Sequence, residues 1–205
     1  MAYHPVDIAD VFRDDPRSQR ERMLAGDMYI ADDPELARMH RRALELSERF
    51  AAEFPADPQA AQRVVRQLLG SCGEDVYIRA PIWVDYGVNI HIGARTFINC
   101  NLTALDVGRI EIGCDCQIGP QCQLVTPTHP IDPDMRSAKL EAAQPIVVED
   151  NVWLGAGVIV CPGVRIGENS VIGAGSVVVR DIPANVVAVG NPARVIRVIS
   201  PQADG

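Results

Sequence analysis

Aliphatic residues recur at strict six-residue intervals through the C-terminal half of the chain. The anchors of this repeat are Val148, Leu154, Val160, Ile166, Ile172 and Val178. Glycine follows three of them, and similar isoleucine–glycine pairs begin at Ile92, Ile112 and Ile118. A repeat this short supplies one strand and one bend, which cannot bury its aliphatic side chains alone. Successive repeats must therefore stack on one another, as in a solenoid.

A second inward position lies four residues after each anchor, where the chain carries Val152, Val158, Val164, Ser170 and Ser176. Strand alternation directs both positions to one side. Three such strands make a triangular coil of 18 residues, so Val148 should lie under Ile166 in a column of buried side chains. The same reasoning places Leu154 under Ile172 and Val160 under Val178. The expected fold is mainly β, a parallel β-helix.

The six cysteines fit a core role better than a metal or disulfide role. Cys116 and Cys122 occupy the inward position of earlier repeats, where a small apolar side chain is needed. Cys114 and Cys116 have no second pair at ligand spacing, so we expect no metal site. No disulfide framework is visible among the others.

Charge and hydropathy narrow the possible partners. The formal net charge is −8 and no basic stripe is visible, which argues against nucleic acid and favours a small ligand. No apolar run approaches the length of a membrane span. The N-terminus, Met1 to Asp7, lacks the basic and apolar regions of a secretion signal. We therefore expect a cytoplasmic protein.

Residues 1–71 are expected to form a helical segment in front of the β-helix. Asp33-Pro34 and Asp57-Pro58 each supply a helix N-cap followed by a proline at the first helical position. Apolar residues then recur at helical spacing after each start signal. Such a pair of helices would cap the open end of the solenoid, whose exposed strands would otherwise pair with other chains. We expect the β-helix to occupy residues 72–183 and a tail to occupy residues 184–205.

Two interruptions break the register of the repeat. Between Ile98 and Ile112 lie 14 residues, two more than two repeats need. Between Leu124 and Val148 the apolar pattern disappears, and the prolines at 130, 133 and 145 oppose ordinary ladder pairing. We expect residues 129–145 to leave the solenoid as a loop, and loops on rigid scaffolds commonly carry function.

Six motifs, in this order, make the chain similar to the maltose and galactoside O-acetyltransferases. They are Met23-Leu24-Ala25-Gly26, Asp85-Tyr86-Gly87 with Asn89-Ile90, Leu105-Asp106-Val107, Thr128-His129-Pro130-Ile131-Asp132-Pro133, Asn151-Val152-Trp153-Leu154-Gly155 and Gly190-Asn191-Pro192-Ala193-Arg194. The resemblance covers residues 20 to 199. It implies a left-handed β-helix, acetyl transfer from acetyl-CoA to a sugar hydroxyl, and a homotrimer with active sites between subunits.

The resemblance also implies two catalytic residues. His129 matches the catalytic histidine, which would act as the general base on the acceptor hydroxyl. Asn99 matches an asparagine near the acetyl thioester and would stabilise the oxyanion. On the residues alone, His129 could be a surface loop histidine. Position 99 could instead carry asparagine because this residue tolerates left-handed backbone conformations.

Further positions match the substrate and cofactor sites of the family. Asp85, Asp106 and Glu141 match positions around the acceptor pocket, although each could also be a solvated turn residue. Galactoside-type members differ at Asp85 and Glu141 and carry an acid where this chain has Val107, so the resemblance favours a maltose or glucose type. The positions that match CoA contacts are Asn99, Ala156, Ala174, Arg180, Arg194 and Arg197. We expect Trp153 to serve in packing or trimer contact, and His91 to pack near the pocket without an assigned role.

Two other functions fit the same solenoid. The first is acyl transfer from acyl-CoA to a non-sugar or amino-sugar acceptor, with the same base and the same cofactor groove. The second is a metal-dependent hydratase, which needs about three converging histidines. Only His91 and His129 lie in the repeat region, so we expect no metal requirement.

Overall fold

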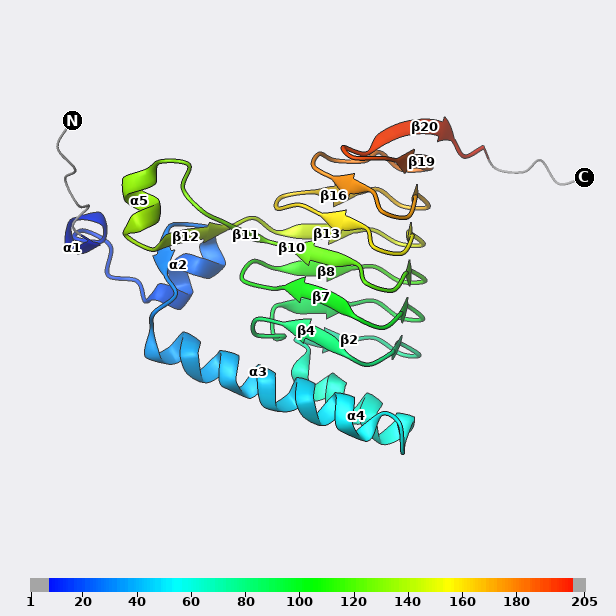
Figure 1. The fold of residues 1–205 in the computed structure, drawn as a ribbon, viewed down its shortest axis with the longest axis horizontal. Coiled ribbons are helices and arrows are strands. Elements are labelled where there is room, and N and C mark those ends of the chain that lie inside the picture. The colour runs from blue at the N-terminus through cyan, green and yellow to red at the C-terminus, as the bar shows by residue number, and fades with distance from the viewer. Residues whose placement is uncertain (1–7, 201–205) are drawn as a thin grey trace, which may run out of the picture.

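The computed structural model describes residues 8–200 as a β-solenoid with a helical segment beneath one end (Figure 1). Residues 1–7 and 201–205 lie outside the described residues, and so does the expectation made for Met1 to Asp7. Within the described chain, no helix combines the length and apolarity needed to cross a bilayer. The expected fold class, a parallel β-helix with an N-terminal helical segment and an extended loop, is confirmed.

The solenoid has three faces, and the stacked strands named below for each face run parallel to one another. The first face consists of β2 (Ser71–Cys72), β5 (Ile90–Ile92), β8 (Ile110–Ile112), β13 (Ile146–Val148) and β16 (Arg165–Ile166). The second begins with β3 (Tyr77–Ile78), β6 (Phe97–Ile98), β9 (Gln117–Ile118), β14 (Trp153–Leu154) and β17 (Val171–Ile172). The third consists of β4 (Ile82–Val84), β7 (Leu102–Leu105), β10 (Gln123–Val125), β15 (Ile159–Val160) and β18 (Val177–Val178).

The buried columns form as the repeat predicts. Val148 pairs with Ile166, Leu154 with Ile172 and Val160 with Val178, and the side chains of all six are buried. Cys116, Cys122, Ser170 and Ser176 are buried at the second inward position. The hydroxyls of both serines are hydrogen-bonded to backbone groups, which satisfies these polar atoms inside the core.

The earlier coils are two residues longer than the later ones, and the extra residues share one corner. Ile98 pairs with Ile118 and Ala104 pairs with Leu124, so the insertion predicted between residues 99 and 108 falls after Ala104. A matching insertion, which the repeat did not predict, lies between Val84 and Ile92, because Val84 pairs with Ala104 and Ile92 pairs with Ile112. We call residues 85–89, 106–109 and 126–145, between the third and first faces, the irregular corner.

Two long helices close the lower end of the solenoid. α3 (Pro34–Glu53) and α4 (Pro58–Leu68) begin at the predicted caps, where the Asp33 and Asp57 carboxylates accept backbone N–H groups. Their apolar faces join the core of the first coil, with Phe50 and Val64 in the same cluster as Ile78. The predicted capping role of this helical pair is confirmed.

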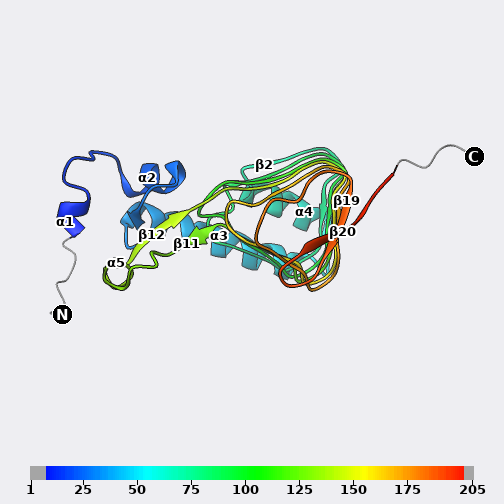
Figure 2. The same cartoon turned by 90° about the horizontal axis from the view of Figure 1, so that it is seen from above.

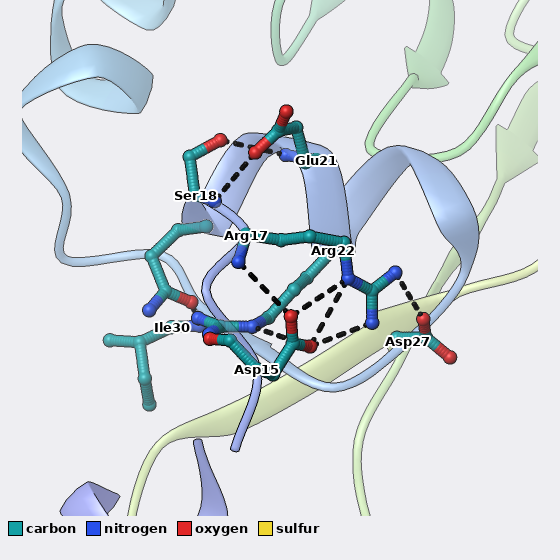
Figure 3. A network of polar contacts seen from close by, with 8 residues as sticks. Asp15, Arg17, Ser18, Glu21, Arg22, Asp27 and Ile30 are labelled. Carbon is teal, nitrogen blue, oxygen red and sulfur yellow. Dashed lines mark hydrogen bonds and ion pairs between the residues drawn. The ribbon is translucent and has the colours of Figure 1, made fainter. Parts of the chain in front are cut away.

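The chain before α3 forms a separate small unit from α1 (Ile8–Val11), α2 (Gln19–Ala25) and β1 (Tyr29–Ile30). Ser18 and Glu21 form a capping box at the start of α2. Asp15 accepts hydrogen bonds from Arg17 and from Arg22, and Arg17 also pairs with Asp27 (Figure 3). The Arg17 guanidinium holds the pKa of the Asp15 carboxyl well below its usual range. This network of hydrogen bonds and ion pairs stabilises the segment, whose strand β1 pairs with residues of the long interruption between Leu124 and Val148.

The expected excursion leaves the solenoid at residue 126, three residues before the predicted start at 129, and it carries regular structure. The excursion contains β11 (Pro127–Thr128), α5 (Pro133–Ser137) and β12 (Leu140–Ala143). β12 pairs antiparallel with β11 and with β1, which gives a three-stranded sheet beside the solenoid (Figure 2). The repeat could not predict this sheet, because the partner strand β1 lies more than 100 residues away in sequence.

The β-helix extends beyond the boundary expected at residue 183. β19 (Val186–Val189) pairs in parallel with β17, and β20 (Arg194–Val198) folds back antiparallel on β19. Both strands belong to the second face. Val186 and Ala188 are buried, so strand alternation continues where the glycine-containing repeat has ended.

Candidate functional site: an acidic pocket and an apolar groove on different corners

A pocket of about 430 Å³ lies at the irregular corner, between the excursion and the helical segment. The excursion contributes Pro127, His129 and Glu141, and the coils contribute Asp85, Tyr86, Leu105 and Val107. The helical segment contributes Tyr29, Ala31, Leu36, Ala37 and His40. Three of the predicted site residues, His129, Asp85 and Glu141, are therefore brought together from distant parts of the chain.

His129 follows β11 directly and is exposed on the pocket wall. The next residue, Pro130, is buried, so the chain is anchored just beyond the histidine. The Arg136 guanidinium of α5 donates to the carbonyl oxygens of Pro130 at 2.9 Å and Ile131 at 2.8 Å. These contacts fix the backbone that carries the imidazole.

Glu141 is held by a residue from the other end of the chain. The Tyr29 hydroxyl donates to Glu141 Oε2 at 2.9 Å, and the two residues face each other across the β1–β12 ladder. Tyr29 is 1% exposed and packs in a cluster with Met23, Leu36, Tyr86, Val107 and Ala143. Burial, together with the Glu141 hydrogen bond, raises the pKa of the Tyr29 phenol far above its ordinary value, so it remains a donor.

Asp85 lies in the pocket wall under a negative potential. Burial first, and then the nearby charges of Asp106 and Glu141, raise the pKa of its carboxyl to about 6 against the opposing effect of His40. His40 Nδ1 lies 2.9 Å from the backbone oxygen of Asp85. A carbonyl oxygen only accepts, so this imidazole nitrogen carries the hydrogen.

Asp106 lies beneath the pocket, with no solvent exposure. Its Oδ1 accepts the backbone N–H groups of Asp85 and Tyr86 at 3.1 and 2.8 Å, and its Oδ2 accepts that of Asn89 at 3.1 Å. Burial raises the pKa of this carboxyl, while these backbone hydrogen bonds oppose the increase. The expectation of a direct acceptor contact is corrected, because every described bond of this carboxylate goes to the backbone. Asp106 holds the corner loop in place.

The second candidate surface is an apolar groove of about 440 Å³ along the second face. It is lined by Asn99, Ala156 and Ala174, which are three of the residues expected to contact CoA, together with Trp153 and Phe97. These residues lie at or near what we call the regular corner, residues 99–101, 119–122, 155–158 and 173–176, where the second face turns into the third. Trp153, which was expected to serve in packing or trimer contact, is 55% exposed and lines the groove.

Glycines let the coils stack closely at the regular corner. A Cβ added to Gly119 would lie 2.7 Å from the Ala156 nitrogen, and one added to Gly155 would lie 2.6 Å from the Ala174 nitrogen. Neither glycine has a positive φ, so close approach rather than backbone conformation requires them. Asn99 occupies the equivalent place one coil below Gly119.

The orientation of the Asn99 amide follows from its partners. Asn99 Oδ1 accepts the Cys100 backbone N–H at 2.8 Å and Arg79 Nη1 at 3.2 Å. Both partners are donors, so Nδ2 is the end left to donate to a ligand. Asn99 has no positive φ, and the left-handed conformation belongs to Asn101. The backbone explanation for asparagine at position 99 is therefore removed.

The three arginines do not gather at one place. Arg194 and Arg197 lie exposed on β20, at the upper end of the second face that carries the groove. Arg180 follows β18 and is exposed where the third face turns into the first face. Within a single chain, Arg180 therefore lies at a different corner from Ala156 and Ala174.

The pocket and the groove are likewise separated. Asn99 precedes β7 and Asp106 follows it, so the whole third face lies between the two corners. At about 3.3 Å per residue of strand, this separation is on the order of 20 Å. One chain therefore keeps His129 and Asn99 apart.

His91 does not pack near the pocket. Its Nδ1 lies 2.9 Å from the Ser71 hydroxyl on the first face, so the expectation made from sequence is corrected. Among residues 8–200, no group of three or more His, Cys, Asp or Glu side chains is arranged to hold a metal ion. No role was predicted from the sequence for Tyr29, His40, Tyr86 or Arg79. Tyr29 and His40 belong to the helical segment, which no motif links to the corner loops, and Tyr86 lies inside one of the six motifs without a role of its own.

Comparison with known proteins identifies relatives over most of the chain. Residues 22–73 match the maltose acetyltransferase hexapeptide capping motif, and residues 145–180 match the bacterial transferase hexapeptide (six repeats). A galactoside O-acetyltransferase of Lactococcus lactis is 40% identical over 88% of this chain and 87% of its own length.

Solved structures agree in fold. A maltose O-acetyltransferase from Clostridium difficile has a TM-score of 0.89 and 42% identity, over 90% of this chain and 99% of its own. A hexapeptide-repeat acetyltransferase from Vibrio cholerae, solved with acetyl coenzyme A, has a TM-score of 0.84 and 34% identity, over 90% and 100%.

Proposed function

Because this chain belongs to the maltose and galactoside O-acetyltransferase family, we propose that it transfers an acetyl group from acetyl-CoA to a hydroxyl of a maltose-like or glucose-like sugar. The observation that carries the proposal is the pairing of a histidine-bearing acidic pocket with an apolar groove edged by the Asn99 amide. The pocket offers hydrogen-bond acceptors to a polyol, and the groove offers a surface to an acyl carrier.

The chemistry needs a base and an oxyanion donor. His129 removes the proton of the acceptor hydroxyl while its oxygen attacks the thioester carbonyl carbon. The electron pair of the carbonyl double bond moves onto oxygen, and Asn99 Nδ2 donates to that oxyanion. When the carbon–sulfur bond breaks, His129 returns the proton to the departing sulfur. The products are an acetyl ester and free CoA.

The donor would lie in the groove of the second face. Trp153, Ala156 and Ala174 supply an apolar wall and small side chains, which suit a pantetheine arm bound through backbone groups. Arg194 and Arg197, at the upper end of the same face, would meet the phosphates, because guanidinium geometry matches phosphate oxygens. The Vibrio cholerae relative, solved with acetyl coenzyme A, supports the choice of donor.

A trimer would bring the pocket of one chain and the groove of another together. The third face lies between the pocket and the groove, so a neighbour packed on this face would bring its regular corner to the irregular corner of the first subunit. In a closed ring of three, each boundary would then hold one His129 and one Asn99 from different chains. Arg180, which lies between the third and first faces in a later coil than the irregular corner, would also reach the boundary.

The acceptor contacts support the maltose or glucose type. The Asp85 and Glu141 carboxylates face the pocket, and carboxylates accept hydrogen bonds from several hydroxyls. Val107, buried in the pocket wall, places an apolar surface where galactoside-type relatives carry an acid. The alternative, an amino-sugar or other acceptor, is favoured by one observation, the acidic lining of the pocket.

Thiol release from acetyl-CoA tests the proposed function directly. The protein should release thiol with glucose, maltose or both, and less with galactosides. The reaction products should carry a hydroxylamine-sensitive acetyl ester. Amino sugars and amino acids complete the panel, and release with these alone would transfer the assignment to the alternative. We also propose a cytoplasmic location, which cell fractionation would check.

A further inference from the structure

The acceptor pocket combines two carboxylates with two histidines. Asp85 and Glu141 face it directly, and Asp106 lies beneath with its carboxylate among backbone amides. Among the described residues, neither lysine nor arginine lines this pocket, and His40 and His129 are its basic side chains.

Several basic residues on the surrounding elements are bonded to groups outside the pocket. On α5, Arg136 donates to the carbonyls of Pro130 and Ile131. On α2, Arg20 pairs with Glu35 at 3.5 Å, and on α3, Arg42 donates to the Gln67 carbonyl. Lys139 precedes β12 and does not line the pocket. Within one chain, none of the described ion pairs joins a carboxylate of the pocket to a lysine or arginine.

The negative potential of the pocket raises the pKa values of two of its side chains, Asp85 and Tyr86. After burial, the neighbouring acids are the main cause that raises the pKa of Asp85. The pKa of the Tyr86 phenol is also raised, first by burial and then by the charges of Asp85, Asp106 and Glu141. A second anion brought into this partly buried space would meet the same repulsion, whereas an ammonium group would be attracted.

We propose that the acceptor pocket selects saccharides by charge, taking neutral and amino-bearing sugars and rejecting those that carry a carboxylate, sulfate or phosphate near the reacting hydroxyl. This inference rests on the proposed function and names the acceptor class for the same site. An amino group of the acceptor would stay protonated and pair with Asp85 or Glu141, while a neighbouring hydroxyl is acetylated.

The test uses sugars that differ only at ring carbon 2. Glucose, N-acetylglucosamine, glucosamine and N-sulfoglucosamine keep the same hydroxyls at carbons 3, 4 and 6. We expect kcat/KM for N-sulfoglucosamine to be at least about 10-fold below that for N-acetylglucosamine, which corresponds to about 1.4 kcal/mol. Glucosamine should equal or exceed N-acetylglucosamine, and its product should be a hydroxylamine-sensitive ester rather than an amide.

Variants identify the source of the discrimination. Asp85→Asn and Glu141→Gln should each lower the ratio of neutral to sulfated kcat/KM several-fold. Because each ratio is internal to one variant, a general loss of activity does not affect it. Glu111→Gln, which removes the same charge on β8 outside the pocket, should leave the ratio unchanged.

The outcomes separate the two proposals. Equal kcat/KM for the neutral and sulfated sugars, or ratios unaltered in both pocket variants, would overturn charge selection and leave acetyl transfer standing. Absence of thiol release with all four sugars and with maltose would overturn the proposed function, and charge selection with it.

Discussion

The regular and irregular corners of the solenoid meet different physical demands. At the regular corner, each coil repeats the one below, and glycines allow backbones to approach where a Cβ would lie under 3 Å from the next coil. At the irregular corner, two-residue insertions, the excursion and the helical segment meet around buried and half-buried carboxylates. Repetition provides an even wall for a long ligand, and its interruption provides a shaped pocket. We therefore expect different kinds of damage from substitutions at the two corners.

The largest expected effect is on catalysis at the irregular corner. His129→Ala should lower kcat by at least about 10²-fold, because the proposed general base is lost. The KM for acetyl-CoA should change little, since the groove proposed to bind the donor lies on the second face. His91→Ala, which removes an imidazole from the first face, is the matched control and should retain its rate. Steady-state kinetics would measure kcat and KM for both variants. Full activity of His129→Ala would contradict the role proposed for His129.

The regular corner should respond in stability. Gly155→Ala places a Cβ 2.6 Å from the Ala174 nitrogen in the next coil, and we expect about 3 kcal/mol of destabilisation or more. Gly175→Ala meets nothing within 4 Å and carries only the strain of its positive φ, about 1 kcal/mol. Thermal or urea unfolding of the pair measures the difference. Equal destabilisation by the two substitutions would show that the stacking distance between coils does not determine which glycines at this corner are needed for stability.

A smaller, pH-dependent effect should appear at Asp85. Its folded pKa of about 6 lies above the ordinary value of 3.8, so the ionised carboxylate is disfavoured in the folded protein. This group therefore costs stability as pH rises from about 4 through 6. Asp85→Asn should be more stable than the parent by about 1 to 2 kcal/mol at pH 7.5, allowing for partial exposure, and the gain should vanish near pH 4. Unfolding at both pH values checks this, and a gain that does not depend on pH would contradict it.

The smallest effect should come from Tyr29, which acts through another residue. Tyr29→Phe removes the hydrogen bond to Glu141 Oε2, worth about 1 kcal/mol, so acceptor KM should rise about 5-fold with kcat nearly unchanged. In a Glu141→Ala background the same substitution should have no further effect. Tyr77→Phe, at an exposed tyrosine on β3, is the control. Additive effects of the two substitutions would mean that Tyr29 does not act through Glu141.

Periodicity predicted the parts of the fold that depend on local spacing. The six-residue repeat identified the columns from Val148 to Val178, and the helix start signals at Asp33 and Asp57 placed α3 and α4. Both depend on residues a few positions apart. The pairing of β1 with β12 joins segments more than 100 residues apart, and no pattern in a single sequence specifies such a partner.

The site shows the same division. The family motifs supplied His129, Asp85 and Glu141, which the structure brings into one pocket, and Asn99, Ala156 and Ala174, which it brings into one groove. They did not reveal that Asp106 is fully buried, because a carboxylate that accepts backbone amides has the same one-letter code as one that binds a ligand. Burial of this kind depends on the corner insertions stacking on one another.

The central claim is that the irregular corner of one subunit and the regular corner of its neighbour form one active site. Subunit complementation tests it most directly. His129→Ala and Asn99→Ala chains, each with a different affinity tag, would be co-expressed, and trimers containing both would be isolated by tandem purification. Each variant alone should be at least about 10²-fold impaired.

Every mixed trimer should contain one boundary that joins an intact His129 to an intact Asn99. We therefore expect the mixed trimers to recover about one third of the parental rate, from one complete site in a ring of three. A rate no higher than that of the two variants alone would contradict a site shared between subunits.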